Sequence, residues 1–322
     1  MDLISFGVNW IIAVQALGAW LEAPMEFFSF LGTEDFFFLI LPLLYWSVDA
    51  SLGMRVAFIL LASASVNGYF KLLFAGPRPY WVSDKVVAFA AESSFGVPSG
   101  HAQNAVSVWG LLASHVRGAR AWGVALALAF LIGFSRWYLG VHFPHDVIMG
   151  WALGAATLWA FIRFEGSVTA WFRSQTFGGQ AATAFIISLL MIGLGMISAL
   201  PLDGYVLPQA QQTNALRVGE LPDPVSVEGF VTLGGVFFGI LLGAAWTMSR
   251  GGYQVQGPLA KRALRYVVGL IGVVILMFGL DMIFPEGQTL IPFIFRYARY
   301  ALVGLWIFAG APWLFFRIKL AD

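Results

Sequence analysis

The sequence predicts an all-α protein, a polytopic bundle of membrane-spanning helices, and three observations support this. Of its 322 residues, 59% are hydrophobic and 11% are charged, whereas about 25% of the residues in a soluble domain are charged. The mean hydropathy is +0.80. Apolar runs of roughly 20 residues recur along the chain, and a helix of that length crosses a hydrocarbon core about 30 Å thick. The strands of a membrane barrel would instead alternate apolar and polar residues.

The composition also limits the chemistry. The chain has no cysteine, which excludes disulfides, thiolate metal ligands and a cysteine nucleophile. The formal net charge is +1, and no nucleic-acid partner is expected, because binding a phosphate backbone needs a concentrated positive field. The first ten residues lack a basic region and a small-residue cleavage site, so no removable signal peptide is expected. Candidate catalytic groups are therefore His, Asp, Lys, Arg and Ser.

The first segment, residues 1–29, is predicted to lie in the membrane interface rather than to cross it. Polar side chains at Gln15, Glu22 and Glu26 interrupt its apolar positions, and two tryptophans flank them. Such a mixture is typical of a helix that rests at the boundary between headgroups and acyl chains.

After this segment, the apolar pattern predicts nine membrane spans. They cover residues 30–49, 54–74, 100–115, 121–139, 146–163, 183–201, 229–248, 266–284 and 290–316. The first six spans lie within residues 30–201, which is the six-helix core that the family resemblance described below implies. Residues 202–228 form a polar loop, and residues 229–322 form a C-terminal extension with three more spans.

The positions of Lys and Arg predict which face is cytoplasmic. With nine spans, one face carries eleven of the 18 basic residues, which are Arg55, Arg117, Arg120, Arg163, Arg173, Arg250, Lys261, Arg262, Arg265, Arg317 and Lys319. The positive-inside rule makes that face cytoplasmic. The polar breaks at 75–99 and 202–228 then lie on the opposite, outer face. We expect an integral protein of the cell (inner) membrane with these loops in the periplasm or outside.

Three polar clusters interrupt the apolar segments at this outer edge. The first, KLLFAGPRPYW, places six residues between Lys71 and the pair Arg78–Pro79. The second is VPSGH, residues 97–101, and the third is SRWYLGVHFPHD, residues 135–146. Arginine can bind two phosphate oxygens as a fork, and lysine adds a point charge. The clusters combine these cations with histidines, which predicts phosphoryl transfer in which the cations neutralise the developing charge.

The turn at Ser99 and Gly100 is predicted to open a helix and to bind an anion. Its small residues precede an apolar run that begins after His101. The first N–H groups of a helix have no intrahelical acceptor, and they lie at the positive end of the helix dipole.

His142 and Asp146 stand four residues apart, so a helix places the imidazole and the carboxylate on one face. A carboxylate that accepts the proton of one ring nitrogen leaves the other nitrogen free to attack. An alternative is a metal site formed by His142, His145 and Asp146. We expect no metal or other cofactor, because His145 lies three residues around the helix and points partly away.

The three clusters, K-x6-RP, PSGH and SR-x5-H-x3-D, resemble the signatures of the type 2 phosphatidic acid phosphatase superfamily. All three match without a gap or a substitution. The resemblance implies a six-helix phosphatase core. The extra C-terminal spans and the strings RPYW and HFPH are similar to the glucose-6-phosphatase branch.

The resemblance also implies a role for each site residue. His142 would attack phosphorus and form a phosphohistidine, Asp146 would orient it, and His101 would protonate the leaving alkoxide and then activate water. The residues implied to bind the phosphate are Lys71, Arg78, Ser99, Gly100 and Arg136.

The expected function is a metal-independent phosphatase that acts, among membrane lipids, on a lipid phosphate or an isoprenyl (pyro)phosphate. The alternative substrate is a soluble phosphoester such as a sugar phosphate, as the glucose-6-phosphatase likeness suggests. A third hypothesis is a transporter or flippase, but the chain shows no inverted repeat. In the extension, Asp281, Arg296 and Arg299 fall in the outer halves of helices, where the default expectation is that they snorkel to the interface and the alternative is a buried ion pair or a headgroup contact. The oligomeric state is not predicted.

Overall fold

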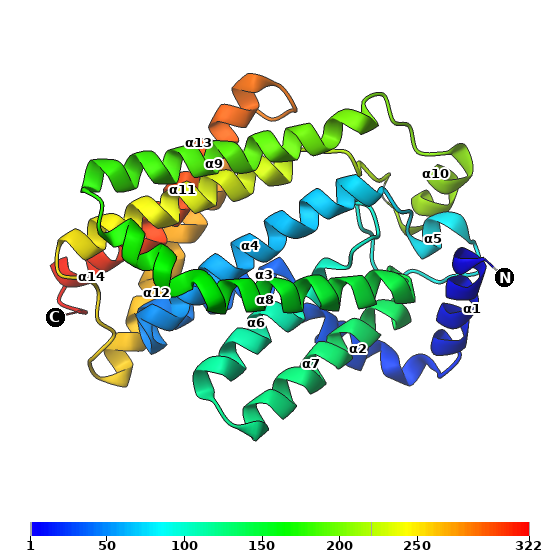
Figure 1. Ribbon diagram of the computed structural model, residues 1–322, viewed down its shortest axis with the longest axis horizontal. Helices are drawn as coiled ribbons and strands as arrows, with labels where there is room; N and C mark the ends of the chain where they lie inside the picture. The colour runs from blue at the N-terminus through cyan, green and yellow to red at the C-terminus, as the bar shows by residue number, and fades with distance from the viewer. Residues whose placement is uncertain (1, 220, 322) are drawn as a thin grey trace. The chain divides into compact units, whose positions relative to one another are not determined.

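The computed structural model describes residues 2–219 and 221–321, and within these ranges every regular element is a helix (Figure 1). This confirms the predicted all-α class. The α-helices are α1 (Leu3–Gln15), α2 (Glu22–Phe30), α3 (Glu34–Leu43), α4 (Ala50–Phe74), α5 (Pro79–Val82), α6 (Gly100–Val116), α7 (Ala119–Tyr138), α8 (Pro144–Arg173), α9 (Phe177–Ala199), α10 (Gln209–Ala215), α11 (Glu228–Ser249), α12 (Leu259–Val274), α13 (Leu290–Leu305) and α14 (Ala311–Arg317). Three π-helical turns follow α3, α12 and α13, at Leu44–Val48, Ile275–Gly279 and Trp306–Gly310.

The chain is an integral membrane protein with several helices long and apolar enough to span a membrane. Among the described residues there are seven such stretches, which are Ala50–Val82, Ala119–Tyr138, Pro144–Arg173, Phe177–Leu202, Glu228–Ser249, Leu259–Gly279 and Leu290–Arg317. The predicted count of nine spans is therefore not confirmed. At the N-terminus, α1 and the helical segment Ala19–Phe30 meet at 87° and would add an eighth span if they count as one.

Two predicted spans, 30–49 and 100–115, form helices that are too short to meet this criterion. Helix α6 has 17 residues, because Ser99 caps its start and Arg117, at φ 64°, ends it. Helix α3 contains Pro42, which cannot donate a backbone hydrogen bond, and it passes into the π turn that ends at Val48. Hydropathy counts apolar residues and does not detect these stops.

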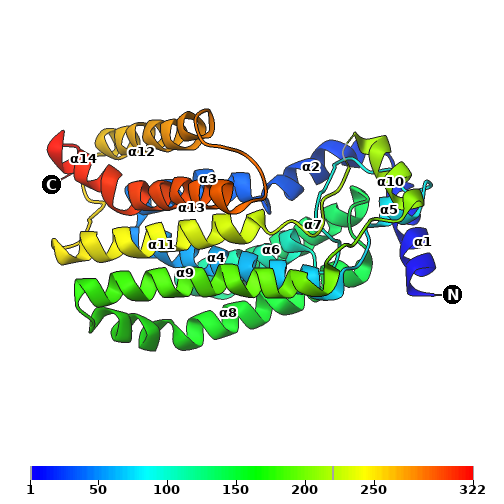
Figure 2. The same cartoon turned by 90° about the horizontal axis from the view of Figure 1, so that it is seen from above.

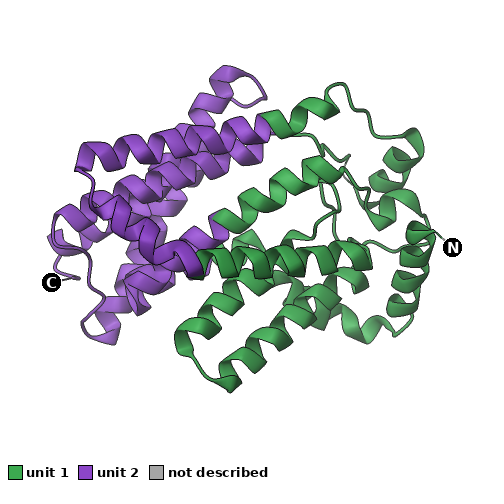
Figure 3. Ribbon diagram, in the orientation of Figure 1, with its two compact units in different colours: residues 1–37, 62–162, 197–226 green, residues 38–61, 163–196, 227–322 purple. Residues whose placement is uncertain are grey.

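The chain divides into two compact units (Figure 3). Unit 1 contains the residues up to 37 together with 62–162 and 197–226, and unit 2 contains 38–61, 163–196 and the residues from 227 onward. Helices α3, α4, α8 and α9 contribute to both units. This division follows contacts in space, so the boundaries predicted from the sequence at residues 29, 201 and 228 stay predictions.

Unit 2 is built on close packing of α11 against α13, which run side by side (Figure 2). A Cβ atom on Gly239 would lie 2.0 Å from the backbone oxygen of Ala301, so only glycine allows the two backbones to approach this closely. The buried side chain of Trp46 donates from Nε1 to the backbone oxygen of Ile307 at 2.8 Å. This bond ties the π turn after α3 to the π turn after α13.

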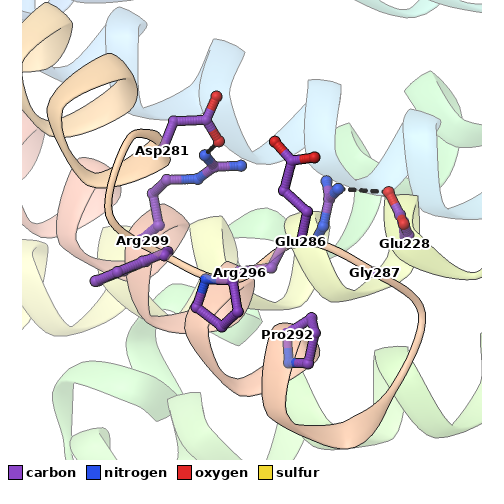
Figure 4. A pocket seen from close by; sticks show the side chains of 9 residues that line it. Glu228, Asp281, Glu286, Gly287, Pro292, Arg296 and Arg299 are labelled. Atoms are coloured by element: carbon purple, nitrogen blue, oxygen red, sulfur yellow. Dashed lines mark hydrogen bonds and ion pairs between the residues drawn. The ribbon is translucent and has the colours of Figure 1, made fainter.

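A polar cavity of about 360 Å³ lies in unit 2 (Figure 4). It is lined by Glu228, Asp281, Phe284, Pro285, Glu286, Gly287, Pro292, Arg296 and Arg299. Arg296 is paired with Glu228, and Arg299 is paired with Asp281. Three carboxylates face two arginines, and both arginines have an acidic partner. The charged residues that the sequence singled out in the extension therefore form ion pairs, and they leave no net positive charge for a phosphate group.

Unit 1 brings the start of α6 against α8. A Cβ atom on Gly150 would lie 2.5 Å from the backbone oxygen of Ser99, and one on Gly154 would lie 2.5 Å from that of Gln103. These two glycines, one helical turn apart on α8, let the backbone at the start of α6 lie directly on it. Helix α6 also packs along α7 (Figure 1). The ends of three helices that carry the sequence motifs are thereby held together.

Candidate active site

All the site residues predicted from the sequence lie in unit 1. Lys71 is in the last turn of α4, Arg78 immediately precedes α5, and Arg136 is in the last turn of α7. Ser99 caps α6, which begins with Gly100 and His101, while His142 lies just before α8 and Asp146 is in its first turn. The three motifs are thus parts of one compact unit, although 75 residues separate Lys71 from Asp146 in the sequence.

His142 and Asp146 form the predicted pair. The distance from His142 Nδ1 to Asp146 Oδ2 is 3.3 Å, and both side chains are buried. The same carboxylate oxygen accepts the backbone N–H of Phe143 at 2.8 Å. The Asp146 carboxylate, held by this N–H, selects the His142 tautomer with the proton on Nδ1, so the lone pair is on Nε2. Burial and the charges of Arg78 and Arg136 lower the pKa of His142 well below its usual value, which keeps the ring neutral.

Arg78 is the centre of the hydrogen-bond network. It is fully buried. Its Nη1 lies 3.3 Å from His142 Nε2 and donates to the backbone oxygen of Val141 at 3.1 Å. Its Nε donates to the backbone oxygen of Ser94 at 2.6 Å, and Nη2 reaches that of Phe95 at 3.2 Å. The guanidinium therefore lies against the nitrogen that would attack phosphorus.

Lys71 holds the loop that precedes α6. Its Nζ donates to Ser94 Oγ at 2.9 Å and to the backbone oxygen of Phe95 at 2.6 Å. An ammonium has three donors, so these two bonds leave one for a ligand. The side chain fixes the loop and adds positive charge to the site.

The turn at Ser99 is attached to the His142–Asp146 pair through the backbone. The N–H of Ser99 donates to the backbone oxygen of Asp146 at 3.0 Å, and Ser99 Oγ accepts the N–H of Ala102 at 3.4 Å. The N–H of Ser99 is therefore used within the protein. Gly100 and His101 are the first two residues of α6 and have no intrahelical acceptor for their N–H groups. These two N–H groups are therefore free of any intrahelical acceptor and available to an anion.

A buried polar network supports this turn from α4. Asn67 Nδ2 donates to Gln103 Oε1 at 2.9 Å and to the backbone oxygen of Pro98 at 3.3 Å. Gln103 Nε2 in turn donates to the backbone oxygen of Ser63 at 2.8 Å. Buried polar groups of this kind are costly unless paired, so the network fixes the start of α6 relative to α4.

His101 has an imidazole nitrogen that is free for chemistry. Its Nε2 is buried and has no hydrogen-bond partner. A Cβ atom on Gly32 would lie 3.2 Å from the ring carbon Cδ2, so this glycine provides the space in which the ring lies. The imidazole lies within the electrostatic field of the charged side chains of Arg136, Glu92 and Arg78. A buried nitrogen without a partner, beside cations, is suited to exchange a proton with a bound ligand.

Arg136 has two partners that the sequence did not predict. Its Nη1 donates to Ser29 Oγ on α2, and its Nη2 is paired with Glu92 Oε1. Oε2 of Glu92 lies 3.3 Å from Arg78 Nη2. The Glu92 carboxylate thus joins the two arginines. The only hint in the sequence is that Glu92 is the sole acidic residue between Asp84 and His101.

Glu92 is ionised in this position. Burial alone would raise the pKa of Glu92, but the charges of Arg78 and Arg136 outweigh burial and hold it well below its usual value. Glu92 was not among the site residues predicted from the sequence. The structure places one there.

The alternative metal site is not assembled. His145 Nε2 lies 3.1 Å from Asp146 Oδ1 but without hydrogen-bond geometry, and its ring stacks on Phe143 with centroids 5.3 Å apart. Among residues 2–219 and 221–321, no group of three or more His, Asp or Glu side chains could hold a metal ion.

Two family models match the chain. Residues 52–170 match the PAP2 superfamily, and residues 231–322 match the transmembrane extension of PAP2 superfamily phosphatases. Phosphatidylglycerophosphatase B of Bacillus subtilis is 33% identical over 156 residues, which cover 44% of this chain and 74% of that protein.

Two longer relatives are more distant. Human glucose-6-phosphatase 2 is 23% identical over 60% of this chain, and lipid phosphate phosphatase delta of Arabidopsis thaliana is 24% identical over 84% of it. The matches cover 65% of the length of each of these relatives. The PAP2 match over residues 52–170 includes every predicted site residue. The chain belongs to the PAP2 superfamily.

Proposed function

We propose that this protein is a metal-independent membrane phosphatase that hydrolyses a lipid phosphate or an isoprenyl (pyro)phosphate through a phosphohistidine on His142. One observation carries the proposal. His142 has its Nδ1 on Asp146 and its Nε2 3.3 Å from Arg78, so the attacking nitrogen and a phosphate-binding guanidinium are adjacent. This is the arrangement that in-line attack on a bound phosphoryl group requires.

In the first step, His142 Nε2 attacks phosphorus and the bond from phosphorus to the leaving oxygen breaks. Arg78 and Arg136 bind the equatorial oxygens, where negative charge accumulates. Asp146 stabilises the positive charge that develops on the imidazole through its contact with Nδ1. His101 gives a proton to the leaving alkoxide, which departs as an alcohol.

In the second step, His101 removes a proton from water. The resulting hydroxide attacks phosphorus, and the phosphorus–nitrogen bond breaks. Inorganic phosphate is released, and His142 regains its lone pair on Nε2. Both steps use the same two histidines and the same cations, and the two arginines take the place that a metal ion has in other phosphoryl-transfer enzymes.

Two relatives have names that refer to lipid substrates, phosphatidylglycerophosphatase B and lipid phosphate phosphatase delta, and this likeness favours a lipid substrate here. Large apolar side chains on α7 and α8 are also exposed, including Phe130 and Trp159, as expected for helices that face acyl chains. A second candidate is a sugar phosphatase. It is favoured by the likeness to glucose-6-phosphatase 2 and by the transmembrane extension.

A phosphate-release panel on the purified protein in EDTA tests the proposed function. The panel contains phosphatidate, phosphatidylglycerophosphate, sphingoid phosphates, undecaprenyl pyrophosphate and hexose phosphates. Because the cations come from the protein, we expect turnover of a lipid member to survive chelation. Vanadate, which mimics the transferring phosphoryl group, should inhibit it. Activity that is lost in EDTA and restored by Mg²⁺ or Zn²⁺ would contradict metal independence, and activity on hexose phosphates alone would establish the second candidate.

The distribution of basic residues supports an active site on the non-cytoplasmic side, in the periplasm or outside. We expect an impermeant thiol reagent to label a cysteine introduced in the loop 202–228 in intact cells, since the chain has no other cysteine. A cysteine introduced at Arg117, on the predicted cytoplasmic face, is the control and should react only after lysis. The reverse labelling pattern would overturn this orientation.

A further inference from the structure

Glu92 occupies the position that a substrate phosphate would take between the two buried arginines. Its Oε2 lies 3.3 Å from Arg78 Nη2, and its Oε1 contacts Arg136 Nη2. Arg78 and Arg136 are 0% and 2% exposed in their side chains, whereas Glu92 is 23% exposed. The carboxylate is thus the outermost of the three groups, at the exposed end of the cationic site.

The backbone around Glu92 is fixed, which places the carboxylate there. The Tyr80 hydroxyl accepts the N–H of Glu92 at 3.1 Å and donates to its backbone oxygen at 3.2 Å. Two residues further on, Ser94 is bonded to both Lys71 and Arg78. A side chain whose backbone is anchored on both sides can leave the arginines by rotation about its own bonds while the loop stays in place.

A carboxylate and a phosphate group differ in their charge and in the number of oxygens that can bind two arginines. Glu92 supplies one charge and two oxygens, and a phosphomonoester dianion supplies two charges and three oxygens. A phosphodiester headgroup, like those of bulk membrane lipids, carries one charge and gains little over the carboxylate already present. Two buried guanidiniums without an anion between them are destabilised, so an anion in this position, carboxylate or phosphate, stabilises the site.

We infer that Glu92 is a tethered competitor that fills the phosphate site between turnovers, so that a phosphomonoester displaces it and a phosphodiester does not. This role rests on the proposed function. It makes Glu92 a specificity residue, because it lowers the affinity for all anions and leaves useful binding only to the doubly charged ones. It also returns to the arginines as product phosphate leaves.

The experiment measures binding of inorganic phosphate and of dimethyl phosphate, a singly charged diester, by calorimetry on the purified full-length protein at pH 8. A site that Glu92 leaves open about one-tenth of the time binds anions about tenfold more weakly than an empty site. We therefore expect Glu92→Gln to bind inorganic phosphate about tenfold more tightly than the wild type and to gain measurable binding of dimethyl phosphate. Asp84→Asn, which removes an exposed charge before the same loop, is the matched control and should change neither affinity more than about twofold.

Thermal unfolding separates competition from a purely structural role. Glu92→Gln leaves the arginines without an anion, so its melting temperature should fall in phosphate-free buffer and recover with phosphate more than that of the wild type does. Glu92→Asp, which keeps the charge but is one methylene shorter, should give an intermediate phosphate affinity. If Glu92→Gln binds phosphate no more tightly than the wild type, or does not bind it at all, the inference is wrong. Hydrolysis assays on the same preparations report on the proposed function independently, because anion binding needs no turnover.

Discussion

Replacing His142 with alanine is expected to abolish phosphate release. The Nε2 of His142, 3.3 Å from Arg78 Nη1, is the proposed attacking atom, and alanine leaves no nucleophile in its place. Loss of a nucleophile in a hydrolase lowers kcat by roughly 10³- to 10⁶-fold. Release of inorganic phosphate from the best substrate in the panel, measured with purified wild type and variant, tests this.

The matched control is His145→Ala, which removes an imidazole three residues away. His145 stacks on Phe143 and has no hydrogen bond to Asp146, so this variant should keep activity within a few-fold of the wild type. A rapid quench with labelled substrate adds a direct test, since a phosphohistidine survives alkali and is lost in acid. Substantial activity in His142→Ala, or equal losses in both variants, would contradict nucleophilic attack by His142.

The candidate site residues could be selected from the sequence because their signal is local. Spacing predicted that His142 and Asp146 meet on one face of a helix; the two side chains do meet, but His142 lies two residues before α8 begins at Pro144 and not on the helix. Small residues marked the start of α6 at Ser99. The alternation of spans then predicted that the motifs share one membrane edge. The structure brings all these residues into one unit, while their catalytic roles stay predictions.

The contacts that the sequence did not predict are long-range. Glu92 approaches Arg136 across 44 residues, and Ser29 approaches it across 107. Nothing in the local pattern around Glu92 distinguishes a carboxylate that binds arginines from one that faces solvent. The sequence also did not predict the contacts of Lys71. This residue was expected to bind phosphate, and its Nζ donates two hydrogen bonds to the loop at Ser94 and Phe95.

The count of nine spans is not confirmed, and the reason is a different physical one. The composition of residues 100–115 is apolar enough to suggest a membrane crossing, yet the helix there has 17 residues. Its inner positions are small or polar, and Gln103, Asn104 and Ser107 are buried in it. A helix that is surrounded by protein need not be long or uniformly apolar, because its neighbours satisfy its polar groups. Hydropathy therefore counts lipid-facing helices more reliably than enclosed ones.

The second large effect is expected for His101→Ala, and it should depend on the leaving group. An alkoxide leaving a lipid phosphate needs a proton as the bond to phosphorus breaks, and His101 Nε2 is buried and has no hydrogen-bond partner. A nitrophenolate is stable without that proton. General acid catalysis contributes about 10²- to 10⁴-fold, so the variant should lose that much activity on a lipid phosphate. Its rate of phosphohistidine formation from nitrophenyl phosphate should fall far less.

Pre-steady-state release of nitrophenolate with substrate in excess is the appropriate measurement, because the proposed mechanism also uses His101 to activate water in the second step and steady-state rates combine both steps. In the variant we expect a burst of nitrophenolate equal to the enzyme concentration, followed by slow turnover as the phosphohistidine accumulates. Gln103→Ala is a control for disturbance of α6, since Gln103 is buried two residues away and bonds to Asn67. It should slow both substrates by a similar factor. If His101→Ala also slows both equally and shows no burst, then His101 is not the acid, and the proton for the alkoxide must come from another group or from water.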